Sequence, residues 1–236
     1  MKLSKLLLAT ILCFTFSGCK KYLDVIPEGQ ASLDDMFKSE VECQKFVQYL
    51  YHNIPTHGGV YLPDMYGADD FVSNVKGTTR WFRFKSILFD EENANSTYFG
   101  MWSTELSTPT GRTNYDIFNS IRYCYLLLER IHKVPDLSPE NLKQWQGEAY
   151  WLIAYYHQIL LDFYGPVVLV KSNTSLNAPE SEMYPQRSSY DECVDFIASN
   201  WDKAAELLPA SWPESRQGYV TATAAKASLS REPNTA

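Results

Sequence analysis

The chain has 236 residues, a formal net charge of −7 at pH 7 and 45% hydrophobic residues, which is typical of a globular protein. The acidic balance argues against nucleic acid as a partner, because binding to phosphates requires clustered Lys and Arg. Aromatic residues make up 14% of the chain, and Tyr is the most frequent of them. Such residues serve cores, but they also serve surfaces that contact amphipathic ligands.

The first 18 residues have the features of a secretory signal. Two lysines precede an apolar run over residues 6–16, and the small residue Gly18 stands directly before Cys19. The run is too short to span a bilayer as a helix, which needs about 20 apolar residues. The order resembles a bacterial lipobox, although Phe16 stands where Leu or Val is usual. We therefore expect cleavage after residue 18 and acyl chains (palmitate) on Cys19 that hold the protein on a membrane. An ordinary signal peptide with a chance cysteine is the alternative.

Cleavage would leave 218 residues with 19 basic and 28 acidic side chains, and hence a net charge of −9. Three cysteines would then remain besides the acylated one. Cys43, Cys124 and Cys193 are far apart in the sequence and do not form a disulfide framework. We expect them to be buried free thiols that pack as small apolar residues.

Helical periodicity dominates most of the chain after a tether at residues 19–31. Capping signals and apolar spacing predict helices over 32–54, 113–134, 138–166 and 188–209 and from Thr221 onward. The predicted buried faces are Val41, Phe46, Val47, Leu50 and Ile54 in the first, Ile117, Ile121, Tyr125 and Leu128 in the second, Leu142, Trp145, Ala149, Leu152, Tyr156, Leu160 and Phe163 in the third, and Tyr190, Val194, Ile197, Trp201, Ala205 and Leu208 in the fourth.

Two helix–turn–helix pairs can be drawn, over residues 113–164 and from 189 onward. They predict a mainly α fold of tetratricopeptide-like helical pairs, although the insertion 165–188 breaks a strict period. The segment 55–111 differs, because it has six glycines and no sustained helical period. Whether residues 79–89 form a strand or the start of a helix stays open. Long loop-rich segments inside a compact domain are often functional.

Four stretches carry a resemblance to a known family. They are "CKKYLDVIPEGQASLDDMF", "DIFNSIRYCYLLLERI", "GEAYWLIAYYHQILLDFYGPVVLV" and "SSYDECVDFIASNWDKAAELLP". In this order and spacing, from Cys19 to about Val220, the chain resembles the SusD/RagB family of outer-membrane lipoproteins of Bacteroidetes. The resemblance implies a SusD-like helical domain over residues 32–236 that binds oligosaccharide or another nutrient. It also implies surface exposure and delivery of the nutrient to a SusC-like TonB-dependent transporter.

The chain departs from the family pattern near its end. Family members are typically about twice this length, and the sequence after "ATAAKAS" does not look like theirs. We therefore expect the chain to correspond to an N-terminal portion that is truncated and incomplete at the C-terminus. The start of the mature chain, "CKKYLD", lacks an acidic cluster, so surface exposure follows from the resemblance alone.

The loop-rich segment contains the candidate carbohydrate-binding residues. Sugars present apolar C–H faces and hydroxyl rims, so a binder needs flat aromatic side chains together with a few polar groups. We select Trp81, Trp102, Tyr98, Asp70 and Arg80. The tryptophans are chosen by residue type and placement, and Asp70 falls where family members often have an acidic residue. The alternatives are that both tryptophans are core residues and that Asp70 caps a turn.

Other chemistry has weaker support. No catalytic motif or metal-ligand spacing is present among the four histidines, so we expect neither an enzyme nor a metal site. The acidic stretch 90–99 suggests calcium, but Asn95 stands where an EF-hand requires Gly. Two alternatives remain: a helical-repeat adaptor that docks on the transporter without binding glycan, and a glycoside hydrolase that uses paired carboxylates.

Overall fold

The computed structural model describes residues 33–51, 54, 117–175 and 177–230. The chain divides into a unit that ends at Met36 and a second unit that begins at Phe37. Only residues 33–36 of the first unit are described. A short 3-10 helix, η2 (Asp35–Phe37), crosses this boundary, and every later element belongs to the second unit.

The described part of the second unit is helical and contains no strand. Its elements are α2 (Glu40–Leu50), α5 (Ile117–Arg130), η3 (Ile131–Lys133), α6 (Pro139–Tyr164), α7 (Glu180–Met183), α8 (Tyr190–Leu207), η4 (Glu214–Arg216) and α9 (Ala222–Leu229). The mainly α fold predicted from the sequence is confirmed.

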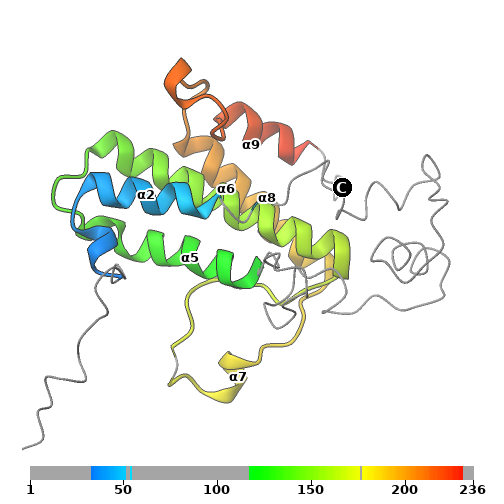
Figure 1. The fold of residues 1–236 in the computed structure, drawn as a ribbon. Helices are drawn as coiled ribbons and strands as arrows, with labels where there is room; N and C mark the ends of the chain where they lie inside the picture. The colour runs from blue at the N-terminus through cyan, green and yellow to red at the C-terminus, as the bar shows by residue number, and fades with distance from the viewer. Residues whose placement is uncertain (1–32, 52–53, 55–116, 176, 231–236) are drawn as a thin grey trace, which may run out of the picture. The chain divides into compact units, whose positions relative to one another are not determined.

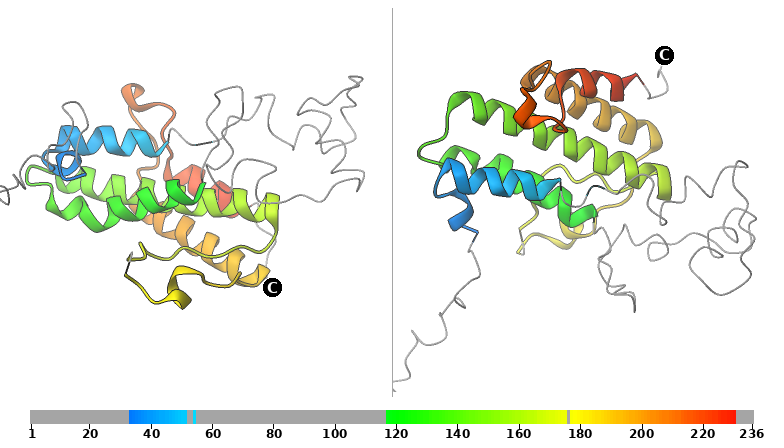
Figure 2. Two further views of the ribbon diagram at one scale, coloured as in Figure 1. Left: turned by 60° about the horizontal axis from the view of Figure 1, so that its bottom comes forward. Right: turned by 45° about the horizontal axis from the view of Figure 1, so that its top comes forward.

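Helix α6 is the centre of the arrangement. It packs against α2, α5 and α8, while α2 also contacts α5 and α9 packs on α8. Figure 1 and Figure 2 show the resulting order, in which the pair α5–α6 is followed by the pair α8–α9. Consecutive helical pairs that bury their faces against neighbouring pairs are the tetratricopeptide-like arrangement that the sequence predicts.

Four helices begin at a hydroxyl side chain that accepts a hydrogen bond from the backbone N–H three residues further on. These N-caps are Ser39 for α2, Ser138 for α6, Ser189 for α8 and Thr221 for α9. Ser189 and Glu192 complete a reciprocal capping box. Each cap satisfies a backbone donor that has no partner inside the helix, so these serines and the threonine fix where the helices start.

The core lies along α6 and the helix faces packed against it. Trp145 and Trp201, predicted as core residues, are 1% and 3% exposed. Val41, predicted to be buried, is 61% exposed. The prediction was wrong because Val41 precedes Cys43 by two residues, and this step of about 200° in a helix places it on the opposite side. Tyr190 is also largely exposed, because it is the first residue of α8 and burial on this helix begins one turn later.

The face of α5 is shifted from the predicted one. Ile117 and Ile121 are fully buried as expected, whereas Tyr125 and Leu128 are only partly buried. Cys124 and Leu127 occupy the core positions instead. The predicted thiols are confirmed, since Cys43, Cys124 and Cys193 are all buried and free.

The insertion 165–188 is a loop whose two ends meet. Gly165 caps α6 with a φ of 67°, a left-handed conformation that favours glycine. Near the other end, Nη1 of Arg187 donates to the carbonyl oxygens of Tyr164 and Pro166 at 3.0 and 2.9 Å. A basic side chain at a helix C-terminus binds carbonyl groups that lack helical partners. The loop therefore leaves and re-enters the helical array at one place, with α7 inside it (Figure 1).

Candidate functional site

The predicted site residues lie outside the described part of the chain. This applies to the lipid-attachment residue Cys19 and to Asp70, Arg80, Trp81, Tyr98 and Trp102. The helices on either side of the segment that contains the five binding residues are described, because α2 ends at Leu50 and α5 begins at Ile117. The end of α2 is therefore the upstream flank of this segment, and the start of α5 is its downstream flank.

The upstream flank is fixed to α6 by two tyrosines. The hydroxyl of Tyr156 in α6 donates to the carbonyl oxygen of Leu50 at 2.6 Å, in a buried setting. Tyr51, the residue that caps α2, donates its hydroxyl to Oε2 of Glu148 at 2.8 Å. Both contacts join positions that are about a hundred residues apart, so they hold the end of α2 in a defined place on α6.

The downstream flank is held by apolar burial and aromatic contacts. Ile117 is the first residue of α5 and is fully buried. One turn and a half later, the ring of Tyr123 packs edge to face against Phe46 and Tyr49 of α2, with centroid distances of 6.1 and 5.7 Å. Such pairs contribute about 0.5–1.5 kcal/mol beyond their area burial. The start of α5 is thus fixed relative to α2.

The described residues with the most unusual chemistry form a polar group that we call the Glu148 cluster: Tyr51, Gln144, Glu148 and Arg216. Glu148 is fully buried. Its Oε1 accepts a hydrogen bond from Nη2 of Arg216 at 2.8 Å, and its Oε2 accepts the bond from Tyr51. Nη1 of Arg216 donates to Oε1 of Gln144 at 3.2 Å. The four residues come from the end of α2, from α6 and from η4.

The electrostatics of the cluster follow from burial. Burial raises the pKa of the Glu148 carboxyl, whereas the hydrogen bond from Tyr51 and the charge of Arg216 lower it. Burial is also the main reason why the pKa of Tyr51 lies well above its usual value, and the neighbouring Glu148 charge raises it further. Tyr51 therefore stays a hydrogen-bond donor at every pH of interest.

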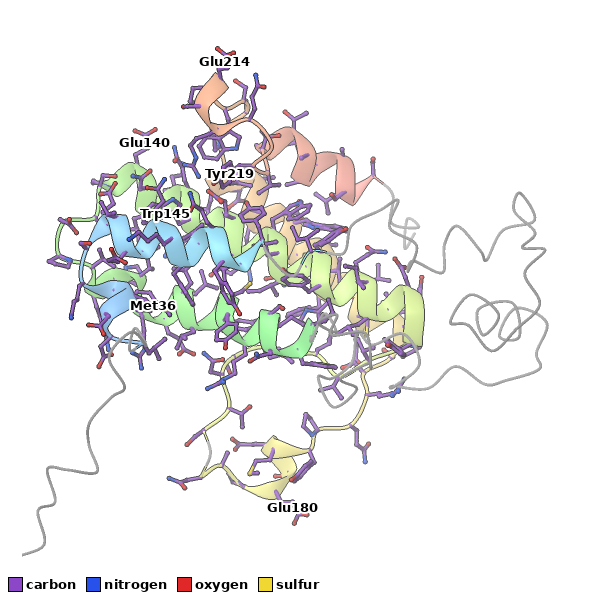
Figure 3. All side chains as sticks on the ribbon, viewed as in Figure 1. Met36, Glu140, Trp145, Glu180, Glu214 and Tyr219 are labelled. Atoms are coloured by element: carbon purple, nitrogen blue, oxygen red, sulfur yellow. The ribbon has the colours of Figure 1, made fainter. Side chains whose placement is uncertain are left out.

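Aromatic rings surround the arginine. The guanidinium of Arg216 lies 4.0 Å from the ring centroid of Trp212 and 4.7 Å from that of Tyr219. Nε1 of Trp212 donates to the carbonyl oxygen of Val220 at 2.7 Å, a hydrogen bond within the connection 208–221 between α8 and α9. In Figure 3 Tyr219 lies close to the helices, while Glu214 on the same connection points away from them.

Sequence reasoning missed the Glu148 cluster. One signal was available, because Glu148 lies three residues after Trp145 and four before Leu152, inside the apolar stripe of α6. A carboxylate on a buried helix face needs a donor, but the sequence does not indicate which residue supplies it. Its two partners are 68 and 97 positions away.

The described residues contain neither a group of metal ligands nor a helix that could span a membrane. No group of three or more His, Cys, Asp or Glu side chains in these ranges is arranged to hold a metal ion. None of the helices in the same ranges is both long and apolar enough to cross a membrane.

A comparison with protein families decides the relationship. The sequence model of one SusD-like family, described as starch-binding and associating with the outer membrane, matches residues 21–232. The chain belongs to this SusD-like family. The match covers all the helices described above, and it confirms the resemblance found in the sequence. A search of curated protein sequences returned no match.

Solved SusD-like structures share the fold. A SusD-like protein from Bacteroides fragilis has a TM-score of 0.61 at 24% identity, over 86% of this chain and 37% of that one. Surface glycan-binding protein A from Bacteroides uniformis gives 0.62 at 19% identity, over 81% and 41%. A laminarin-binding SusD-like protein gives 0.64 at 18% identity, over 82% and 39%. This chain thus spans less than half the length of each of these structures.

Proposed function

We propose that this chain is part of an outer-membrane protein that binds carbohydrate before its uptake. The observation that carries the proposal is the family match over residues 21–232. Two structures that share its fold support it, since their names state glycan binding and laminarin binding. The proposal is binding without catalysis, in agreement with the absence of a catalytic motif from the sequence.

The ligand contacts are assigned to the segment between α2 and α5. Trp81, Tyr98 and Trp102 supply flat aromatic faces for the C–H face of a sugar ring, and Asp70 and Arg80 supply hydrogen bonds to hydroxyl groups. The described framework suits this role, because both flanks of the segment are fixed to α6 or to each other. Binding residues must be held close to one geometry, and a rigid support on both sides favours this.

The location and the partner are part of the same proposal. Acyl chains on Cys19 would hold the protein on the outer membrane, since two or more buried chains give durable anchoring. The bound sugar would then be passed to a SusC-like TonB-dependent transporter. Replacement of Cys19 by Ser should release the protein from the membrane fraction, and continued sedimentation of the variant with membranes would contradict the lipid anchor.

Retention in native gels that contain starch or laminarin tests the proposal. The full chain, purified in detergent, should be retarded by at least one of these polysaccharides. The double variant Trp81→Ala, Trp102→Ala should migrate as in an empty gel, with unchanged helical content by circular dichroism. Tyr184→Ala is the matched control, because Tyr184 is a highly exposed aromatic residue outside the segment.

Loss of helical content in the double variant would assign both tryptophans to the core. Migration without retardation in both polysaccharides, together with co-purification with the transporter, would favour the adaptor instead.

A further inference from the structure

One carboxylate joins three parts of the chain. Glu148 stands in the middle of α6, and each of its two oxygens binds a different distant residue. Oε2 accepts a hydrogen bond from the hydroxyl of Tyr51 at the end of α2. Oε1 accepts one from the guanidinium of Arg216, which lies in the connection 208–221 between α8 and α9. A substitution of Tyr51 or of Arg216 therefore changes the surroundings of Glu148, which also binds the other residue.

Arg216 is held in a fixed orientation. Its guanidinium bonds both Gln144 and Glu148 on α6 and lies against the rings of Trp212 and Tyr219. The planar fork of arginine suits this combination of two directed hydrogen bonds and aromatic stacking, whereas a lysine ammonium does not. Only about a fifth of the Arg216 side chain is exposed.

The connection and the end of α2 also touch directly. The ring of Tyr51 packs edge to face against Tyr219, with centroids 5.4 Å apart. Tyr51 and Trp212 both pack against a small apolar cluster, which consists of Ala204, Leu208, Val220 and Ala225. The carboxylate and the rings thus connect the same two segments by two routes.

Stability alone is a weak explanation for a charge at this position. A buried ion pair gains little over well-packed apolar residues of similar volume, because both ions lose their hydration. Its best-attested use is to fix one geometry among several that apolar packing would tolerate. Among the described residues, Tyr51 and Arg216 are the groups whose hydrogen bonds and charge offset the effect of burial on the Glu148 carboxyl.

We propose that Arg216 is a positioning residue, which acts through Glu148 and Tyr51 to fix the end of α2. It thereby fixes the position of the last residues before the segment 55–111. The part of this inference that concerns ligand binding rests on the proposed function. The coupling between Arg216 and the end of α2 does not, and it can be measured without any ligand.

Hydrogen exchange of the full chain in detergent, followed by mass spectrometry, tests the coupling. Arg216→Gln should make the amides of residues 47–51 exchange about tenfold faster, as expected for the loss of a hydrogen bond to a charged group. Arg187→Gln is the matched control, since Arg187 binds backbone carbonyls at the insertion and should leave residues 47–51 unchanged. If Arg216→Gln makes exchange faster only in residues 209–221 and leaves residues 47–51 unchanged, the proposal is overturned.

A milder pair of variants keeps the test decisive if Arg216→Gln does not fold. Tyr51→Phe removes only one hydroxyl, and it should make residues 209–221 exchange faster although they lie far away in the sequence. In a Tyr51→Phe background, Arg216→Gln should add little further change at residues 47–51, because the hydrogen-bonded route through Glu148 is already broken and only the ring contact with Tyr219 remains. Additive effects of the two substitutions would show that they act separately and would overturn the proposal.

The binding part uses the polysaccharide gel described above. Arg216→Gln should weaken retention of the chain several-fold, while Arg187→Gln should not. Unchanged retention with faster exchange at residues 47–51 would overturn the positioning role for binding. If the wild-type chain is not retained by any polysaccharide, the proposed function fails, and the exchange experiment still decides whether Arg216 fixes α2.

Discussion

Nε2 of His157 accepts a hydrogen bond from the backbone N–H of Val170 at 3.2 Å, so a side chain in the last turns of α6 holds the chain that has just left this helix. Its other ring nitrogen, Nδ1, donates to the carbonyl oxygen of Ile153 at 2.7 Å. A ring that donates on one side and accepts on the other must be neutral. His157 is fully buried, and Phe196 of α8 packs against its ring.

This arrangement predicts a loss of stability in acid. Burial lowers the pKa of His157 from 6.5 to about 4, so the unfolded chain binds the proton more tightly than the folded chain. The free energy of unfolding should therefore fall as the pH decreases from about 6.5 to about 4, by up to about 3 kcal/mol from this group. Urea denaturation at several pH values measures it.

The neutral variant His157→Gln is the comparison, since an amide can both donate and accept. Its free energy of unfolding should depend less on pH over the same interval. An equal pH dependence in the wild type and in His157→Gln would contradict the assignment of a neutral, buried imidazole.

Gly147 should resist replacement by alanine. In the middle of a helix such a change usually stabilises by about 0.5–1 kcal/mol. A Cβ atom at Gly147, however, would lie 2.9 Å from Cγ of Leu208 and 3.0 Å from Cβ of Leu207, where α8 ends against α6. We expect Gly147→Ala to destabilise by about 1–3 kcal/mol in urea denaturation. Lys143→Ala, at an exposed position of the same helix, should be nearly neutral, and a stabilising Gly147→Ala would refute this account of the packing.

The buried cysteines should not react in the folded protein. Burial, with a smaller contribution from the Glu40 charge, raises the pKa of Cys43 to about 12, and burial also raises the pKa of Cys124. Because the thiolate is the reactive form, iodoacetamide at pH 8 should leave both residues unlabelled in peptide mapping. Both should react fully in denaturant. Rapid labelling of either one under native conditions would show that its part of the core opens readily.

The effect of removing Arg216 should depend on pH. The raised pKa of Glu148 means that its ionisation costs folding free energy, and Arg216 reduces that cost. Without Arg216 the pKa of Glu148 rises further, so the stability that this group contributes is present at low pH and is lost as the pH rises through the new value. Arg216→Gln should therefore lose more stability relative to the wild type at pH 7 than at pH 5. An equal loss at both pH values would mean that Arg216 contributes through packing alone.

The sequence predicts some of these features better than others, for physical reasons. Helix α6 was predicted well because it is long, strictly periodic and marked at both ends by Ser138 and Gly165. Val41 was placed on the wrong face because a short helix offers few positions from which to find the phase. The Glu148 cluster was not predicted because it depends on tertiary contacts with residues far away in the sequence. The assignments of Trp81 and Trp102 stay predictions, since both lie outside the described residues.

Titration calorimetry of the wild-type chain with laminarin and with starch tests the central claim most directly. We expect saturable binding of at least one of them, with an affinity at least tenfold weaker in the Trp81→Ala, Trp102→Ala variant. Such a loss corresponds to about 1.4 kcal/mol, which is within the range of one or two lost aromatic contacts. If neither polysaccharide gives saturable heat with the wild-type chain, the proposal that this chain binds carbohydrate is contradicted.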